Sequence, residues 1–451
     1  MLGESEDRGN LGSPLASRLA VLWAIGLALA VAVNNVVYHY TPATDALVYL
    51  ARGKEFAELS FFNPLTNWNY APGYSLFLAL TSPITAFKPA LIAALQSLLF
   101  FAAAFVFVRR LFRARILADA RLARVTLALL VCNPNLWFPL GAIGPESLVG
   151  ALVLLVSVAF LRSRESQQRR HLLGASAWLG LLVLMRFEWL FLPFLGAFVV
   201  KARQRPQALA WLLVCPILAV GLNSARNQVT YGEPKLLSYA SGAVIYSGNN
   251  LNLDGSYHSS EVSGFVPEAH EPERARLQAL KTRDFRQWVK DQDAFFKRLA
   301  REAWVEAPLA QLAVIPLKLG KLWVMPNHFD IYTADANFTR SLQIAELFSF
   351  QRWPWYGPWK HGFYLVLHWL LLALIGAGLV GHWRGRRGLS DDARVFFSYV
   401  VAVAVLISLV FAGPLYGLPR FHVPVLMLLT FLAAQPLTNL VVRFRPARQL
   451  S

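Results

Sequence analysis

Asp45 is the residue of this chain best placed to do chemistry. It follows a first apolar run directly and opens the segment TDALVYLARGKEFAEL. A carboxylate this close to the hydrocarbon of a membrane costs several kcal/mol unless it is paired, hydrated or used, so ionisable groups there are candidates for function. Asp is also a favoured N-cap residue, and both roles stay open for Asp45 at this point.

Other charged and amide side chains are predicted on the same side of the membrane as Asp45. A carboxylate can accept the proton of an attacking hydroxyl, and arginines stabilise a phosphate leaving group through charge-assisted hydrogen bonds. Together they would suit group transfer from a phosphate-linked donor. Each also has a structural alternative: a helix-start acid, mutual neutralisation, or an arginine anchored at the interface. The residues are Glu146, Arg186, Glu188, Arg226, Asn249, Asn250 and Arg420.

The composition identifies the elements that must position these groups as membrane helices. Of 451 residues, 56% are hydrophobic and only 15% are charged, whereas soluble domains carry about 25% charged residues. The net charge of +17 comes largely from short loops between apolar spans, where basic residues mark the cytoplasmic side. Nucleic acid is therefore not expected as a partner. The two cysteines lie in apolar segments, which supports neither a disulfide framework nor a cysteine metal site.

The predicted fold class is an all-α polytopic membrane protein with about ten to thirteen spans. Spans are expected at 17–37, 91–108, 125–140, 145–161, 172–185, 189–200, 208–222, 362–380, 395–412 and 423–441. The run 74–87 is expected to be re-entrant or interfacial, and 309–325 either crosses or does not. The organisation is then a cytoplasmic tail (1–16), an N-terminal membrane core (17–225) with a first outer loop (38–73), a periplasmic loop (226–308), a C-terminal membrane region (309–441) and a second tail (442–451).

Within the periplasmic loop, apolar residues recur at helical spacing, which predicts an amphipathic helix from Asp284 to Glu306 that covers the membrane face. Such a stripe is more often an interface than a ligand site. His258 and His270 lie in the same loop. Isolated histidines in a polar loop are usually solvated, so we predict no obligatory metal, although a divalent ion stays compatible with the sequence.

Several motifs resemble the GT-C glycosyltransferases of the protein O-mannosyltransferase and aminoarabinose transferase type, which use polyprenyl-phosphate sugars. The resemblance covers nearly the whole chain. It departs from the mannosyltransferases in having one acid instead of two in the first motif, and from the aminoarabinose transferases in replacing Glu-Lys-Pro-Pro by Asn-Tyr-Ala-Pro. The matching positions are Asp45, Tyr49 and Ala51, the turn 71–77, Pro145-Glu146-Ser147, Arg226-Asn227, Tyr231-Gly232, Gly248-Asn249-Asn250, and 419–424.

The resemblance implies a GT-C fold and an inverting transfer of a hexose or pentose to a lipid, glycan or protein acceptor. The enzyme would be multi-pass in the cell inner (plasma) membrane, with its site facing the periplasm or exterior, among membrane lipids. Asp45 would be the general base, and Glu146 would orient the acceptor or assist as a second acid. Arg226 and Arg420 would bind the donor phosphate. Substrate contacts would come from Tyr49, Tyr74, Asn249 and Asn250.

A transporter or flippase of a lipid-linked or anionic solute is the alternative. Transporters usually place polar groups near the midplane and often have repeated halves. Here the charged candidates gather at one face and the two halves differ, which favours the enzyme.

Overall fold

The computed structural model describes most of the chain between residues 44 and 443. The described ranges are 44–68, 70–133, 143–166, 168–200, 204–236, 238–250, 266–324, 356–385, 389–415 and 422–443, with the single residues 135 and 140. The predicted first span at 17–37 lies outside them, as do Arg420 and His258. The predicted total of spans therefore stays a prediction.

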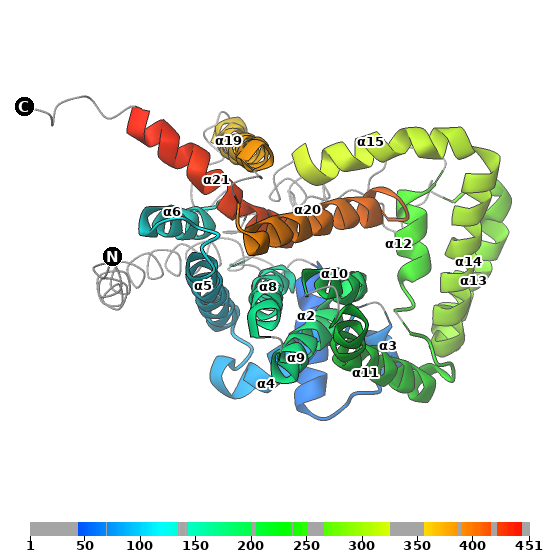
Figure 1. Cartoon of the computed structure of the whole chain (residues 1–451). Helices are drawn as coiled ribbons and strands as arrows, with labels where there is room; N and C mark the ends of the chain where they lie inside the picture. Colours follow the sequence, from blue (N-terminus) through cyan, green and yellow to red (C-terminus); the bar gives the residue numbers. More distant parts are fainter. Residues whose placement is uncertain are drawn as a thin grey trace, which may run out of the picture.

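Every element in the described ranges is a helix (Figure 1). The first half holds α2 (Thr44–Ala57), α3 (Pro64–Asn67), α4 (Gly73–Thr85), α5 (Pro89–Arg113), α6 (Ala120–Val131), α8 (Glu146–Ser166), α9 (Arg169–Met185), a 3-10 helix (Phe187–Phe191), α10 (Leu192–Val199) and α11 (Arg205–Tyr231). The second half holds α12 (Ser241–Gly248), a 3-10 helix (Glu268–His270), α13 (Glu271–Arg283), α14 (Phe285–Glu306), α15 (Pro308–Val324), α19 (Tyr356–Gly385), α20 (Asp391–Ala412) and α21 (Val423–Arg443).

Six of the described helices, namely α5, α8, α11, α19, α20 and α21, are long and apolar enough to cross a membrane. The prediction of an all-α, multi-pass membrane protein is therefore confirmed. Other predicted spans are shorter. The span expected at 189–200 consists of a 3-10 helix followed by the eight residues of α10. Eight helical residues rise only about 12 Å, well short of the roughly 30 Å of hydrocarbon.

Side-chain caps fix where several helices begin. Asp119 accepts a hydrogen bond from Leu122 N at 2.8 Å at the start of α6, and Asp284 accepts one from Gln287 N at 3.0 Å at the start of α14. Such caps satisfy backbone N–H groups that have no partner within the helix. The caps thereby fix the boundary between α5 and α6 and the boundary between α13 and α14.

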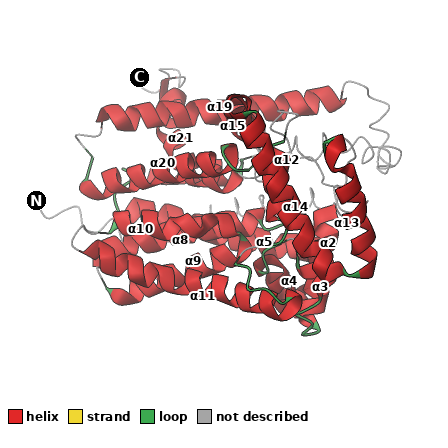
Figure 2. Ribbon diagram, turned by 90° about the vertical axis from the view of Figure 1, so that its right-hand side faces the viewer, coloured by secondary structure: helices red, strands yellow, loops and turns green. Residues whose placement is uncertain are grey.

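The long helices lie side by side in Figure 2, and their order brings distant segments to the same end of the bundle. α9 packs against both α8 and α11, and α21 packs against α6, α8 and α19. Because α8 and α9 form a hairpin and α10 returns the chain before α11, the start of α8 lies at the same end as the last residues of α9 and α11. Glu146, Arg186 and Arg226, which the sequence placed on one side of the membrane, therefore lie at the same end of the bundle.

The predicted amphipathic helix is confirmed as α14. Its apolar face is buried against α12 and α13, with Trp288, Val289, Phe295 and Phe296 each at most 3% exposed. The Trp288 ring also contacts the Trp68 ring, with centroids 5.4 Å apart. α14 thereby holds the segment that follows α3, close to the Asp45 region.

Candidate functional site

One face of α2 carries the first part of the candidate site. Asp45, Tyr49, Arg52 and Phe56 are spaced by four, three and four residues, so an α-helix brings them to the same side. Tyr49, Arg52 and Phe56 are buried, and Asp45 is half-buried. Asp45 is the second residue of α2 and thus lies inside its first turn, where the helix dipole favours a carboxylate.

Tyr70 connects Asp45 to the aromatic residues that the sequence predicted for this site. The Tyr70 hydroxyl donates a hydrogen bond to Asp45 Oδ1 at 2.7 Å. The Tyr70 ring lies 4.8 Å from the Tyr49 ring, and the Tyr49 ring lies 5.0 Å from the Tyr74 ring, measured between centroids. The Tyr74 hydroxyl in turn bonds Gln96 Oε1. Asp45, Tyr49 and Tyr74 are therefore brought together.

Arg52 is a site residue that the sequence reasoning missed. It is 0% exposed, its Nη1 donates to the backbone oxygen of Tyr70 at 2.9 Å, and its guanidinium lies 5.2 Å from the centre of the Phe56 ring. Burial, and then the nearby positive charge of Arg226, lower the pKa of Arg52 from 12.5 to about 9. The signal was present in the sequence, because Arg52 lies seven residues, or about two helical turns, from Asp45.

Arg226 approaches the same place from the last turns of α11. Its Nη2 donates to Asn227 Oδ1 at 3.2 Å, and Asn227 Nδ2 donates to the backbone oxygen of Lys235 at 2.7 Å. The Tyr231 hydroxyl, five residues on, donates to the backbone oxygen of Pro64 at 2.8 Å. These bonds hold the end of α11 against α3, and the charge of Arg226 acts on Arg52 of α2. Binding of phosphate by Arg226 stays a prediction.

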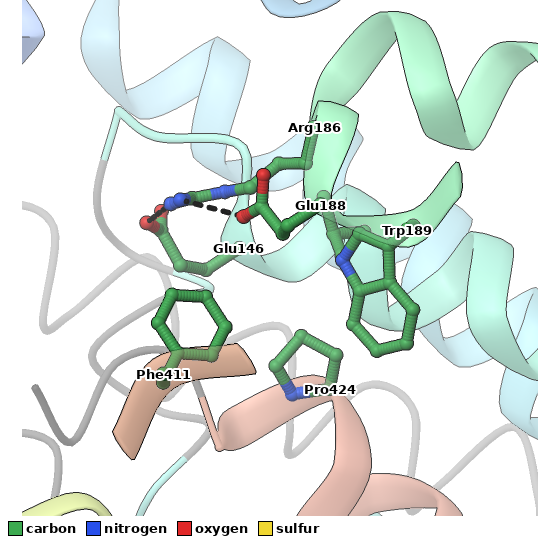
Figure 3. A pocket seen from close by; sticks show the side chains of 7 residues that line it. Glu146, Arg186, Glu188, Trp189, Phe411 and Pro424 are labelled. Carbon is green, nitrogen blue, oxygen red and sulfur yellow. Dashed lines mark hydrogen bonds and ion pairs between the residues drawn. The ribbon is translucent and has the colours of Figure 1, made fainter. Parts of the chain in front are cut away.

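Glu146 lies in a second part of the site, a small pocket at the start of α8. Arg186 forms ion pairs with Glu146 and, at 3.2 Å, with Glu188, so one cation lies between two carboxylates (Figure 3). The three side chains are 13% to 19% exposed, and the group carries a net charge of −1. The pocket is lined by Glu146, Val149, Arg186, Glu188, Trp189, Phe411 and Pro424.

The two parts of the site share one packed boundary. Gly73 lies directly against the backbone of Leu184 and Met185, one residue before Arg186, so α4 and α9 meet without a side chain between them. Ile143 and Leu148, which flank Glu146, belong to the same buried cluster as Tyr49 and Tyr74. The Asp45 group and the Glu146 group are thus neighbours within one end of the bundle.

Asn249 and Asn250 lie elsewhere, in a buried polar network of the C-terminal half. Asn249 Oδ1 accepts from Trp304 Nε1 at 3.2 Å and from Lys318 Nζ at 3.0 Å. Its Nδ2 donates to the backbone oxygens of Ile245 and Pro414, both at 2.7 Å. Asn250 Nδ2 donates to the backbone oxygens of Tyr246 and Ser247, near the end of the preceding α12. In the structure Asn249 joins α12, α14, α15 and the end of α20, and a substrate contact by either residue stays a prediction.

The absence of an obligatory metal also stays a prediction. Among the described residues, no three or more His, Cys, Asp or Glu side chains gather in a way that could hold an ion. His270 lies 3.3 Å from Glu302 through its Nε2, and His258 is outside the described ranges.

No protein-family model matches the chain, and no curated protein matches it. Among solved structures it is similar to the archaeal oligosaccharyltransferase AglB from Archaeoglobus fulgidus, described in complex with an inhibitory peptide and a dolichol-phosphate. The identity is 13%, the TM-score is 0.43, and the match covers 95% of this chain and 51% of that one. The chain thus spans about half the length of AglB, and similarity at this level assigns neither a family nor an activity.

Proposed function

We propose that this chain is a membrane glycosyltransferase of the GT-C type, which moves a sugar from a polyprenyl-phosphate donor to an acceptor at the outer face of the membrane. The observation that carries the proposal is the juxtaposition of a carboxylate with arginines. Asp45 is held by Tyr70, and the backbone of the same Tyr70 is held by Arg52, which lies close to Arg226. A base and an anion-binding group are the two elements that transfer from a phosphate donor requires.

The proposed reaction is an inverting displacement at the anomeric carbon of the donor. The acceptor oxygen forms a bond to that carbon, its proton passes to Asp45, and the bond from the carbon to the phosphate oxygen breaks. The polyprenyl phosphate leaves with the bonding electrons, and its added negative charge is stabilised by Arg226 and Arg420. No metal is required for this balance of atoms and charge.

Glu146 has a supporting part in this proposal. Arg186 pairs with both Glu146 and Glu188, so the Glu146 carboxylate is already held by a cation. Its proposed role is to orient the acceptor by accepting hydrogen bonds from hydroxyl groups. The hexose or pentose of the donor would lie at the periplasmic or exterior face, while its polyprenyl tail lies among the lipids of the inner membrane.

A transfer assay tests the proposal. Purified protein in lipid is given a set of radiolabelled polyprenyl-phosphate sugars, and wild type is compared with Asp45→Asn. Loss of a general base lowers the rate by about two to four orders of magnitude. Asp291→Asn, the same substitution at a carboxylate that accepts a hydrogen bond from Gln287 within α14, is the control and should keep the wild-type rate.

Near-normal turnover by folded Asp45→Asn would sink the assignment of the base. Labelled lipid that crosses a vesicle membrane without losing its sugar, in both wild type and variant, would favour the transporter alternative instead.

A further inference from the structure

Arg52 is a fully buried cation whose hydrogen-bonding groups are largely unused. Its Nη1 donates to the backbone oxygens of Tyr70 at 2.9 Å and Ala71 at 3.5 Å. Within the part of the chain that the structure describes, neither Nε nor Nη2 has a hydrogen-bond partner. A buried charge normally remains only when it is paired and hydrogen-bonded, because its desolvation is costly. Folding alone therefore does not account for this guanidinium.

A second cation makes the position still less favourable without an anion. Burial is the main reason that the pKa of Arg52 is lowered, and the positive charge of Arg226 is the second, while the nearby Glu55 acts in the opposite direction. Two guanidinium groups in a buried place repel each other, and an anion between them would convert that repulsion into attraction. Guanidinium groups bind phosphate oxygens through parallel, charge-assisted N–H···O bonds. Nε and Nη2 of Arg52 could donate such a pair of bonds to one phosphate.

The surroundings of Arg226 indicate where such an anion comes from. Leu222 and Val229 lie four residues before and three residues after Arg226, on the same face of α11, and are 67% and 63% exposed. α11 is one of the six helices suited to crossing a membrane. An anion bound at Arg226 therefore lies beside an apolar strip that faces lipid, which fits a phosphate attached to a long hydrocarbon chain better than a free phosphate ion.

We propose that Arg52, together with Arg226, binds the phosphate of a polyprenyl-phosphate lipid, with the hydrocarbon tail lying along the exposed face of α11 at Leu222 and Val229. This inference rests on the proposed function and adds Arg52 to its site. Through Tyr70, the same residue that bonds Asp45, Arg52 also sets the position of the phosphate relative to the base. The group that receives the departing negative charge is thereby fixed next to the group that takes the proton.

A binding experiment with the full-length protein in detergent micelles tests the site. The probes are polyprenyl phosphate without a sugar, the corresponding polyprenol, and inorganic phosphate, and the variants are Arg52→Gln, Arg52→Lys and Arg110→Gln. Arg110 is a matched control, because it is a mostly buried arginine that pairs with Glu165 away from α2.

Wild type and Arg110→Gln should bind polyprenyl phosphate equally, and polyprenol much more weakly. Arg52→Gln should weaken binding of polyprenyl phosphate by about 10- to 100-fold, the loss expected for hydrogen bonds to a charged group. Arg52→Lys should be intermediate, since it restores the charge without the planar fork. Equal binding of the lipid phosphate by wild type and Arg52→Gln would overturn the proposal. Competition by inorganic phosphate as strong as that by the lipid would also overturn it, in favour of a site for the free ion.

Two further results keep this proposal separate from the transfer activity and from folding. Binding that depends on Arg52, in a protein that transfers no sugar, would retain the phosphate site and reject the proposed function. Transfer that depends on Asp45 but keeps its KM in Arg52→Gln would retain the proposed function and reject the phosphate site at Arg52. If Arg52→Gln does not fold, Arg226→Gln and the wild-type preference for polyprenyl phosphate over polyprenol decide the question, and equal affinity for the two lipids would reject the site.

Discussion

The Tyr70 hydroxyl donates a hydrogen bond of 2.7 Å to Oδ1 of Asp45, across 25 positions of sequence. This bond joins the segment that follows α3 to the start of α2. It orients the carboxylate that the proposed mechanism uses as a base, while the backbone oxygen of Tyr70 accepts from Arg52. A single residue thus relates the base to the buried cation.

Tyr70→Phe should therefore reduce transfer without unfolding the protein. The Phe ring keeps the contact with Tyr49, and the hydrogen bond to Asp45 is lost. A hydrogen bond to a charged group contributes about 1.5–3 kcal/mol, so we expect a rate lower by about tenfold or more. Tyr239→Phe, which removes a hydroxyl 3.5 Å from the backbone oxygen of Glu233, is the control. Unchanged kcat in Tyr70→Phe would show that the bond does not orient the base.

Asn249→Ala should destabilise the protein strongly and leave the rate per folded molecule unchanged. The substitution removes the acceptor of Trp304 Nε1 and the donor to the backbone oxygen of Pro414. It also removes one of two acceptors of Lys318 Nζ, which keeps the backbone oxygen of Gly413 at 3.0 Å. Each buried group left without a partner costs about 1–3 kcal/mol, so the free energy of unfolding should fall by about 2–4 kcal/mol. Chemical denaturation with a parallel transfer assay measures both quantities. A rate that falls with no loss of stability would instead support the substrate contact predicted for Asn249 from sequence.

Hydropathy and helical periodicity were enough to predict the membrane helices and α14. These features depend on residues a few positions apart, which one helix brings together. Asp45, Tyr49 and Tyr74 could also be predicted as a group, because the short loop between them limits how far they can separate. The exact pairing through Tyr70 could not, since it depends on how that loop folds.

Contacts between distant segments were not predictable in the same way. Asn249 meets Trp304 and Lys318, which lie 55 and 69 positions away, and nothing in the local sequence marks them as partners. Arg186 was recognised as charged and near Glu188, but its pairing with Glu146 spans 40 positions and depends on the packing of α8 and α9. Arg52 was missed because its burial depends on the packing of the segment around Tyr70 against α2, which local sequence does not show.

The packing of α14 against α12 should lose stability in acid through Asp293. Burial alone would raise its pKa, but hydrogen bonds from Lys235 and Lys297 and from Gly242 N outweigh burial and lower the pKa of Asp293 below 3.8. A carboxyl whose pKa is lower in the folded state stabilises the protein above its unfolded-state pKa, and this contribution is lost as the pH falls through the folded-state value.

Asp293→Asn should accordingly be less stable than wild type at pH 7, and the difference should shrink as the pH falls below about 4. Unfolding by denaturant at a series of pH values measures it. Asp291→Asn, on the same helix and hydrogen-bonded to Gln287, should show a much smaller difference. A gap between Asp293→Asn and wild type that stays constant down to pH 3 would contradict the ion-pair explanation.

Gly73→Ala should separate the two parts of the site. A Cβ atom at this position would lie 2.5 Å from the backbone carbon of Leu184 and 2.7 Å from Met185 N, and backbone atoms cannot rotate aside. α4 must then move away from α9, which costs about 1–3 kcal/mol in a well-packed interior. Because Tyr74 follows Gly73 and Arg186 follows Met185, the same movement displaces residues of both parts, so transfer should fall together with stability. Gly174→Ala is the matched control, since a Cβ there meets nothing within 4 Å and helix propensity favours alanine by about 1 kcal/mol. If both alanine variants unfold at the same denaturant concentration and transfer equally fast, the close approach of α4 to α9 does not hold the site together.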